Sequence, residues 1–133
     1  MESTLKDLSI YRLEKARTNL EIAKYLFDDE VFGVALNRAY YAAFDAMRAV
    51  NALDGFDSSK HSGVISHFNQ NHVKTGDFDA KTSTVIKRAS MLREKSDYED
   101  FFEPAKEDVE RTIADVDCFI KEVEAFLAQK WSN

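Results

Sequence analysis

Residues 31–53 read VFGVALNRAYYAAFDAMRAVNAL, a segment rich in alanine and aromatic side chains. Its apolar residues fall on most sides of a helix instead of forming one stripe, which is typical of a helix enclosed by other helices. We therefore expect this segment to form a helix at the centre of a bundle or in a subunit interface.

The segments on either side carry the 3.6-residue period of amphipathic helices. Residues 4–27 predict one long helix, and residues 60–71 and 80–95 predict two more, the first of them short, with Ser58 or Ser59 as the cap of the short one. Pro104 suits the first turn of a last helix that extends to residue 129, after an acidic and aromatic connection over residues 97–103. The apolar residues of this last helix alternate spacings of four and three, a seam suited to packing at a shallow angle: Val109, Ile113, Val116, Ile120, Val123 and Leu127.

Long helices joined by short links predict an all-α fold, an antiparallel up-and-down four-helix bundle with one short extra helix. The length of 133 residues suits a single domain over residues 1–133, and four Gly and one Pro are too few for the turns of an all-β fold. The lone Cys118 excludes an intramolecular disulfide and a thiolate zinc cluster. No uncharged run approaches the roughly 18 residues that span a bilayer, so we expect a cytoplasmic protein without a membrane segment.

The charge is unevenly distributed along the chain. The net charge of -6 argues against a protein that simply coats nucleic acid, because phosphate binding depends on a basic surface. Residues 60–95, however, hold 7 basic and 3 acidic side chains, while the flanking parts are acidic. This middle third is either a solvated face with a chance excess of charge or a surface for an anionic ligand.

The common cofactor and metal motifs are missing from the sequence. It contains no Gly-rich phosphate loop, HExxH, EF-hand or CxxC pattern. The three histidines, His61, His67 and His72, are spaced by six and five residues, which does not bring three imidazoles to one face of an α-helix. His61 and His72 lie at the edges of an apolar stripe and His67 points elsewhere, so we predict no metal site and no cofactor.

Polar residues interrupt the apolar segment at one place. Arg38, Tyr41 and Asp45 share a helix face at positions i, i+3 and i+7. One interpretation is a structural ion pair, across helices or across a dimer interface, because an unpaired buried charge is costly. The other is a polar pocket in which Arg38 receives a phosphate and Tyr40 or Tyr41 stacks or forms a hydrogen bond.

Four blocks of sequence resemble small prokaryotic proteins of the HEPN superfamily: NRAYYAAF at 37–44, KHSGVI at 60–65, VKTG at 73–76 and KSDY at 95–98. The resemblance implies an all-α bundle, usually a homodimer, often encoded with a minimal nucleotidyltransferase in a two-component or toxin–antitoxin pair. Many HEPN proteins are metal-independent endoribonucleases, and their motif is an Arg followed after four to six residues by His, often with a polar residue before the Arg.

Carried onto this sequence, the resemblance makes Arg38 the motif arginine and Asn37 the polar residue before it, but Asp45 stands at the histidine position. Imidazole exchanges protons near neutral pH because its pKa is about 6.5, whereas that of Asp is near 3.9 and a nearby Arg38 lowers it further. The tyrosine that family toxins carry two residues after the histidine is replaced by Met47. His61 is the remaining proton-transfer candidate, if the 54–59 loop brings Lys60 and His61 to the Arg38 face of this or another subunit.

These observations predict Arg38, Asp45 and His61 as candidate catalytic residues, and as ligand contacts Asn37, Arg38, Tyr41 and Lys60. The leading hypothesis is a protein that binds nucleotide or RNA phosphate and is the partner of a minimal nucleotidyltransferase. Two alternatives stay open. One is an active metal-independent endoribonuclease toxin, and the other is a structural interaction module without catalysis.

Overall fold

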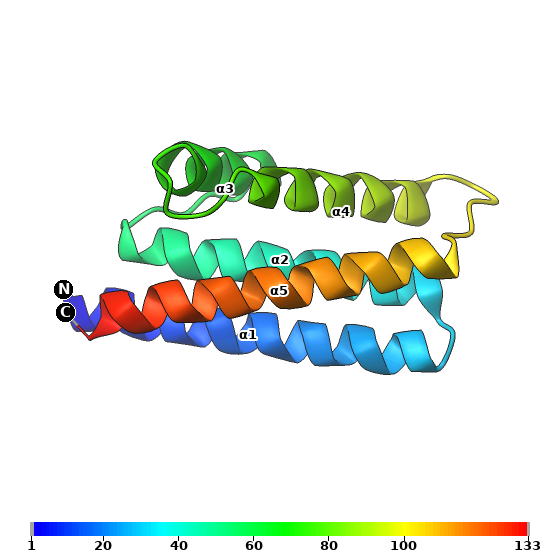
Figure 1. Cartoon of the computed structure of the whole chain (residues 1–133), viewed down its shortest axis with the longest axis horizontal. Coiled ribbons are helices and arrows are strands. Elements are labelled where there is room, and N and C mark those ends of the chain that lie inside the picture. The colour runs from blue at the N-terminus through cyan, green and yellow to red at the C-terminus, as the bar shows by residue number, and fades with distance from the viewer. Residues whose placement is uncertain (1, 133) are drawn as a thin grey trace.

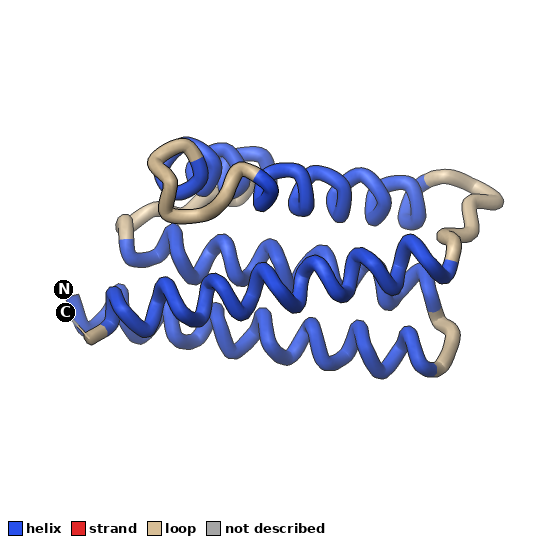
Figure 2. The backbone as a smooth tube through the Cα atoms, in the orientation of Figure 1, coloured by secondary structure: helices blue, strands red, loops and turns tan. Residues whose placement is uncertain are grey.

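The computed structural model describes residues 2–132, so residues 1 and 133 of the expected domain lie outside the described part. Four long helices run alternately up and down (Figure 1): α1 (Glu2–Asp28), α2 (Phe32–Leu53), α4 (Lys81–Tyr98) and α5 (Lys106–Trp131). The short helix α3 (His61–Phe68) lies at one end of the bundle, beside the start of α4. Figure 2 shows the connecting loops at the two ends of the helices. The predicted all-α bundle with one short extra helix is confirmed.

Helix α2 is the centre of the bundle, because α1, α3, α4 and α5 all contact it. Six of its alanines are fully buried, and their small side chains let the neighbouring helices approach closely: Ala35, Ala39, Ala42, Ala43, Ala46 and Ala49. The apolar faces of α2 are thus covered largely within one chain, as predicted for a helix at the centre of a bundle.

The seam predicted on the last helix is also confirmed, since all six of its residues are buried on α5. At the end of α5, the Trp131 Nε1 donates to Ser9 Oγ at 3.2 Å, and Ser9 Oγ donates to the Ala49 carbonyl at 2.7 Å. These bonds join α5, α1 and α2 at one end of the bundle. None of the described helices has both the length and the apolar character needed to cross a bilayer.

Two predicted boundaries around the connection between α4 and α5 are wrong. Helix α4 continues through Asp97 and Tyr98, because Asp97 pairs with Arg93 one turn earlier and accepts a hydrogen bond from Asn37 on α2. Pro104 does not enter the last helix. Ala105, with extended backbone angles, is its N-cap, and α5 begins at Lys106.

The third helical segment does not stay α-helical along its length. After Phe68 it widens into a π-helical turn, η1 (Asn69–Val73), closed by a bond from the Lys74 amide to the Asn69 carbonyl at 2.9 Å. Neither serine is its cap: Lys60 is the N-cap residue, and Ser58 Oγ accepts from the Lys60 amide. The wide turn also corrects the expected position of His67, because residues five apart now share a face and His67 lies beside His72.

Candidate functional site

A cavity of about 320 Å³ opens between α1 and α2, and three of the six site residues predicted from the sequence line it. Helix α1 supplies two lining residues and α2 supplies five: Lys15, Asn19, Arg38, Tyr41, Phe44, Asp45 and Arg48. The predicted residues Arg38, Tyr41 and Asp45 are thus brought to one site.

Arg38 is held at this cavity by amide oxygens. Its Nε and Nη2 donate to Asn37 Oδ1 at 3.0 and 2.7 Å, and its Nη1 donates to Asn19 Oδ1 at 3.1 Å. The guanidinium carbon lies 5.2 Å from the centre of the Tyr41 ring. Amides are neutral, and among the described side chains, those of residues 4–132, no carboxylate forms an ion pair with Arg38. Its positive charge therefore remains available to an anion in the cavity.

Asn37 is a positioning residue for Arg38. While its Oδ1 accepts from the guanidinium, its Nδ2 donates to Asp97 Oδ2 on α4 at 3.1 Å. The same carboxylate oxygen accepts from Arg93 Nη1 at 3.4 Å. Because both ends of the Asn37 amide are engaged, Asn37 fixes the orientation of Arg38 and has little freedom to contact a ligand directly.

Asp45 does not pair directly with Arg38. Asn19 stands between them, since its Oδ1 accepts from Arg38 and its Nδ2 donates to Asp45 Oδ2 at 2.9 Å. Within one chain the two therefore form no direct ion pair, and pairing across a dimer interface stays a prediction. Asp45 is buried while still lining the cavity, so it can act on a molecule that enters.

Burial raises the pKa of the Asp45 carboxyl above its ordinary value, because desolvation disfavours the charged form. Lys15, the bond from Asn19, Arg48 and Arg38 all lower this pKa, but together they do less than desolvation does. Arg38 lowers this pKa as expected, but its effect is the smallest of those named.

A raised pKa makes Asp45 a source of pH-dependent stability. The folded chain binds the Asp45 proton more tightly than the unfolded chain, so this group favours folding below its ordinary pKa, and the contribution is lost as pH rises through the folded pKa. We expect Asp45→Asn to remove this loss. Its carboxamide oxygen can still accept from Asn19, so the variant should gain stability over the parent as pH rises from 4 to 7. Urea unfolding at both pH values measures the difference, and an equal gap at both would contradict the assignment.

Two cations of the cavity, Lys15 and Arg48, were not predicted from the sequence. Arg48 continues the face of Arg38, Tyr41 and Asp45 at i+10, so the same periodicity could have found it. Lys15 lies on α1, and only the register between two helices brings it here. Arg48 Nη2 also bonds to Asp57 at 3.1 Å, and the Arg12 Nη2 bonds to the same carboxylate at 2.9 Å.

His61 lies against α2 but outside the cavity lining. Its ring centre is 4.3 Å from that of Phe44 and 5.6 Å from that of Tyr41, so it is next to two lining residues. Burial, followed by the charges of Arg93 and Arg48, lowers the pKa of His61. Burial also raises the pKa of Tyr40, so the hydroxyl keeps its proton, and it forms a hydrogen bond with His61 Nδ1 at 3.0 Å. His61 is a neutral imidazole in an aromatic cluster at neutral pH.

Lys60 and the basic middle third do not supply the cavity. Lys60 is not among its lining residues, and the three lining cations all come from the first 59 residues, which are acidic overall. The cavity therefore takes none of its cations from residues 60–95, and the two interpretations of that stretch stay open. A count of charged side chains along a stretch of sequence adds together residues that the fold places on different faces.

Comparison with known proteins identifies a recognised domain over most of the chain. A sequence profile of the HEPN domain matches residues 10–126. The protein named "Putative toxin MJ0142", from Methanocaldococcus jannaschii, is 29% identical over 118 residues, covering 89% of this chain and 80% of its own. A "UPF0332 protein" from Thermotoga maritima is 33% identical over 117 residues, covering 88% and 89%. "Putative toxin MJ0605", also from M. jannaschii, is 31% identical, covering 88% and 87%.

Proposed function

The chain belongs to the HEPN domain family, and from this premise we propose that it is a toxin-like protein that binds the phosphate of a nucleotide or RNA at Arg38. In this proposal it is a cytoplasmic homodimer and the partner of a minimal nucleotidyltransferase. The toxin names of two relatives support the first part, and the family resemblance supports the partner.

The observation that carries the proposal is the state of Arg38. Its guanidinium lines an open cavity and is held by neutral amides, so its charge is oriented without being neutralised. Lys15 and Arg48 line the same cavity. A guanidinium offers paired N–H donors that match a phosphate, and neighbouring cations stabilise its remaining charge.

A second cavity supports a nucleotide over a bare phosphate. It has a volume of about 310 Å³ and shares Lys15 and Asn19 with the first; its other lining residues are Tyr11, Glu14 and Thr18. Tyr11 is 61% exposed, with Lys15 Nζ 5.8 Å from the centre of its ring, and an exposed aromatic ring is a surface on which a base can stack. Phosphate at Arg38 and base at Tyr11 would occupy adjoining cavities along α1.

The raised pKa of Asp45 favours a second candidate, an endoribonuclease. RNA cleavage through the 2′-hydroxyl needs one group to take a proton and one to give it. A carboxyl with a raised pKa is protonated more often near neutral pH than a solvated Asp, so it is better suited to act as a general acid, and it lies in the same cavity as Arg38. His61 contributes less to this candidate because it does not line the cavity.

Replacing Arg38 by Ala tests the binding proposal. We expect the affinity for ADP and for a labelled single-stranded RNA to fall roughly thirtyfold, about 2 kcal/mol, because charge-assisted hydrogen bonds are lost. Fluorescence anisotropy measures the RNA affinity and calorimetry measures that for ADP. Arg111→Ala is the matched control, since Arg111 is an exposed arginine on α5, and it should bind as the parent does. Unchanged binding in the Arg38 variant would leave the structural interaction module as the better explanation.

The partner and the homodimer are tested separately. Several large apolar side chains are exposed on α1 and α2, among them Tyr25, Ile22 and Val34. We expect light scattering to give twice the mass of the chain, and a minimal nucleotidyltransferase encoded beside it to copurify. A monomeric mass would remove the homodimer from the proposal.

A further inference from the structure

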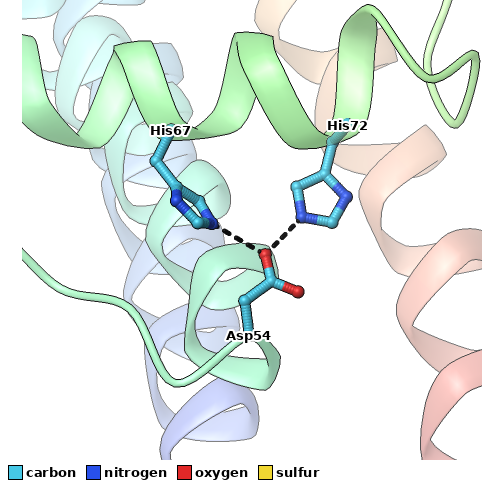
Figure 3. A group of neighbouring side chains, drawn as sticks. All are labelled: Asp54, His67 and His72. Carbon is cyan, nitrogen blue, oxygen red and sulfur yellow. Dashed lines mark hydrogen bonds and ion pairs between the residues drawn. The ribbon is translucent and has the colours of Figure 1, made fainter.

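Two histidines and an aspartate lie together at the end of α2, outside the Arg38 cavity (Figure 3). Asp54 is the C-cap residue of α2, His67 belongs to α3 and His72 to η1. Asp54 Oδ2 lies 2.9 Å from His67 Nε2 and 2.6 Å from His72 Nε2. One donor atom from each of the three residues lies within 4.8 Å of the others. None of these residues lines the Arg38 cavity.

The π-helical turn creates this arrangement. Residues five apart in a regular α-helix point about 140° apart, which would separate His67 from His72. The wide turn over residues 69–73 adds about one residue to the helical turn and returns His72 to the side of His67. Such turns are rare because they disrupt the regular hydrogen bonding of an α-helix. Those that occur are found frequently at functional sites.

Both imidazole rings are held in place by other contacts. The Phe56 ring stacks on His67 with a centroid distance of 4.0 Å and an interplanar angle of 9°. The buried His72 ring has Phe68 and Phe126 each at 5.7 Å, and its Nδ1 lies 3.0 Å from Asp77 Oδ2. With a proton on Nδ1 donated to Asp77, the lone pair of His72 Nε2 faces the cluster once the proton between Nε2 and Asp54 Oδ2 has been released to solvent on metal binding. A carboxylate on the outer nitrogen is the usual companion of a metal-binding histidine.

We propose that Asp54, His67 and His72 bind one divalent transition-metal ion of the zinc class. Imidazole nitrogens and a carboxylate oxygen are ligands that Zn²⁺ accepts, and three protein ligands leave a fourth position for solvent. That position is accessible because the Asp54 side chain is 33% exposed. Donor atoms around a tetrahedral Zn²⁺ are about 3.3 Å apart, so the two contacts of Asp54 lengthen by roughly half an ångström on binding.

The proton on His67 must move for the ion to bind. Asn71 Nδ2 donates to His67 Nδ1 at 3.2 Å, which places the proton of this ring on Nε2, facing Asp54. The metal ion takes the place of that proton, and the proton then resides on Nδ1. Asn71 is exposed, so its amide can turn and accept from Nδ1 through its oxygen.

Zinc binding by the purified, untagged chain tests the proposal. After treatment with EDTA and its removal, equilibrium dialysis against ZnCl₂ should give one zinc per chain, and the melting temperature should rise with zinc concentration because the ion binds the folded state. His67→Ala should lower the zinc affinity at least a hundredfold, since loss of a ligand exceeds the loss of an outer partner. His61→Ala is the matched control and should retain the affinity of the parent.

Asp54→Asn provides a second variant that keeps the side-chain shape. It should weaken zinc binding while circular dichroism shows a folded chain, so a folding failure in one variant does not decide the matter. Binding of no zinc by the parent chain would overturn the proposal. So would stoichiometric binding that survives in both the His67 and the Asp54 variants. Neither outcome bears on Arg38 and nucleotide binding, because the two sites share no residue.

Discussion

Asp45→His is expected to raise the rate of RNA cleavage at least a hundredfold at neutral pH. The cavity already holds Arg38, Lys15 and Arg48, which would bind the phosphate and stabilise the charge that develops on it. What a carboxyl supplies poorly near pH 7 is a group that both takes and gives a proton, and a positioned imidazole contributes about 10²–10⁴ in rate. The substitution also restores the arginine and histidine spacing of the endoribonucleases that the sequence resembles.

The measurement is cleavage of an end-labelled single-stranded RNA by purified variants at matched concentration. Asp45→Asn is the control, because its amide has a similar shape but does not exchange protons near neutral pH. Adding Arg38→Ala to Asp45→His should return cleavage to the level of the parent. A folded Asp45→His variant with no gain would count against a phosphate site at Arg38, whatever the activity of the parent chain.

Phe68→Ala is expected to have the largest effect on stability. Phe68 is fully buried, and its ring lies 5.2 Å from that of Phe78 and 5.7 Å from those of Phe119 and His72. Removing a buried phenyl group loses its transfer free energy and leaves a cavity, so the free energy of unfolding should fall by about 3–5 kcal/mol.

Urea unfolding measures this loss as a lower midpoint at an unchanged slope. Phe101→Ala is the matched control. Phe101 is fully exposed in the connection between α4 and α5, so the free energy of unfolding should change by less than about 0.5 kcal/mol. A loss below 1 kcal/mol for Phe68→Ala would mean that the aromatic cluster around it is not a cooperative part of the core.

The sequence predicts the fold well because the decisive information is local. The apolar character of residues 31–53 and the four-three alternation on α5 are properties of single segments, and both correspond to buried faces. The end of α4 is harder to predict from local pattern. Asp97 belongs to a polar, acidic stretch, and it is held in the helix by Asn37, which is sixty residues earlier.

The site is predictable only in the part that lies on one helix. Arg38, Tyr41 and Asp45 share a face of α2, and helical periodicity brings them together. Lys15 joins them because α1 and α2 pack antiparallel in one particular register, which no periodicity within either helix determines. The Asp54 cluster could not be predicted for another reason. An α-helical period applied across residues 69–73 separates His67 from His72, whereas the π-helical turn brings them together.

The carboxylate of Asp57 is shared by two competing guanidinium groups, Arg12 and Arg48. An anion in the cavity that attracts Arg48 weakens the bond between Arg48 and Asp57, so that Asp57 is bonded mainly to Arg12. Arg12 also donates to the Arg48 carbonyl in the last turns of α2. If an anion binds in the cavity, it competes with Asp57 for Arg48, and by reciprocity a change that strengthens the Asp57–Arg48 pair would weaken the binding of the anion.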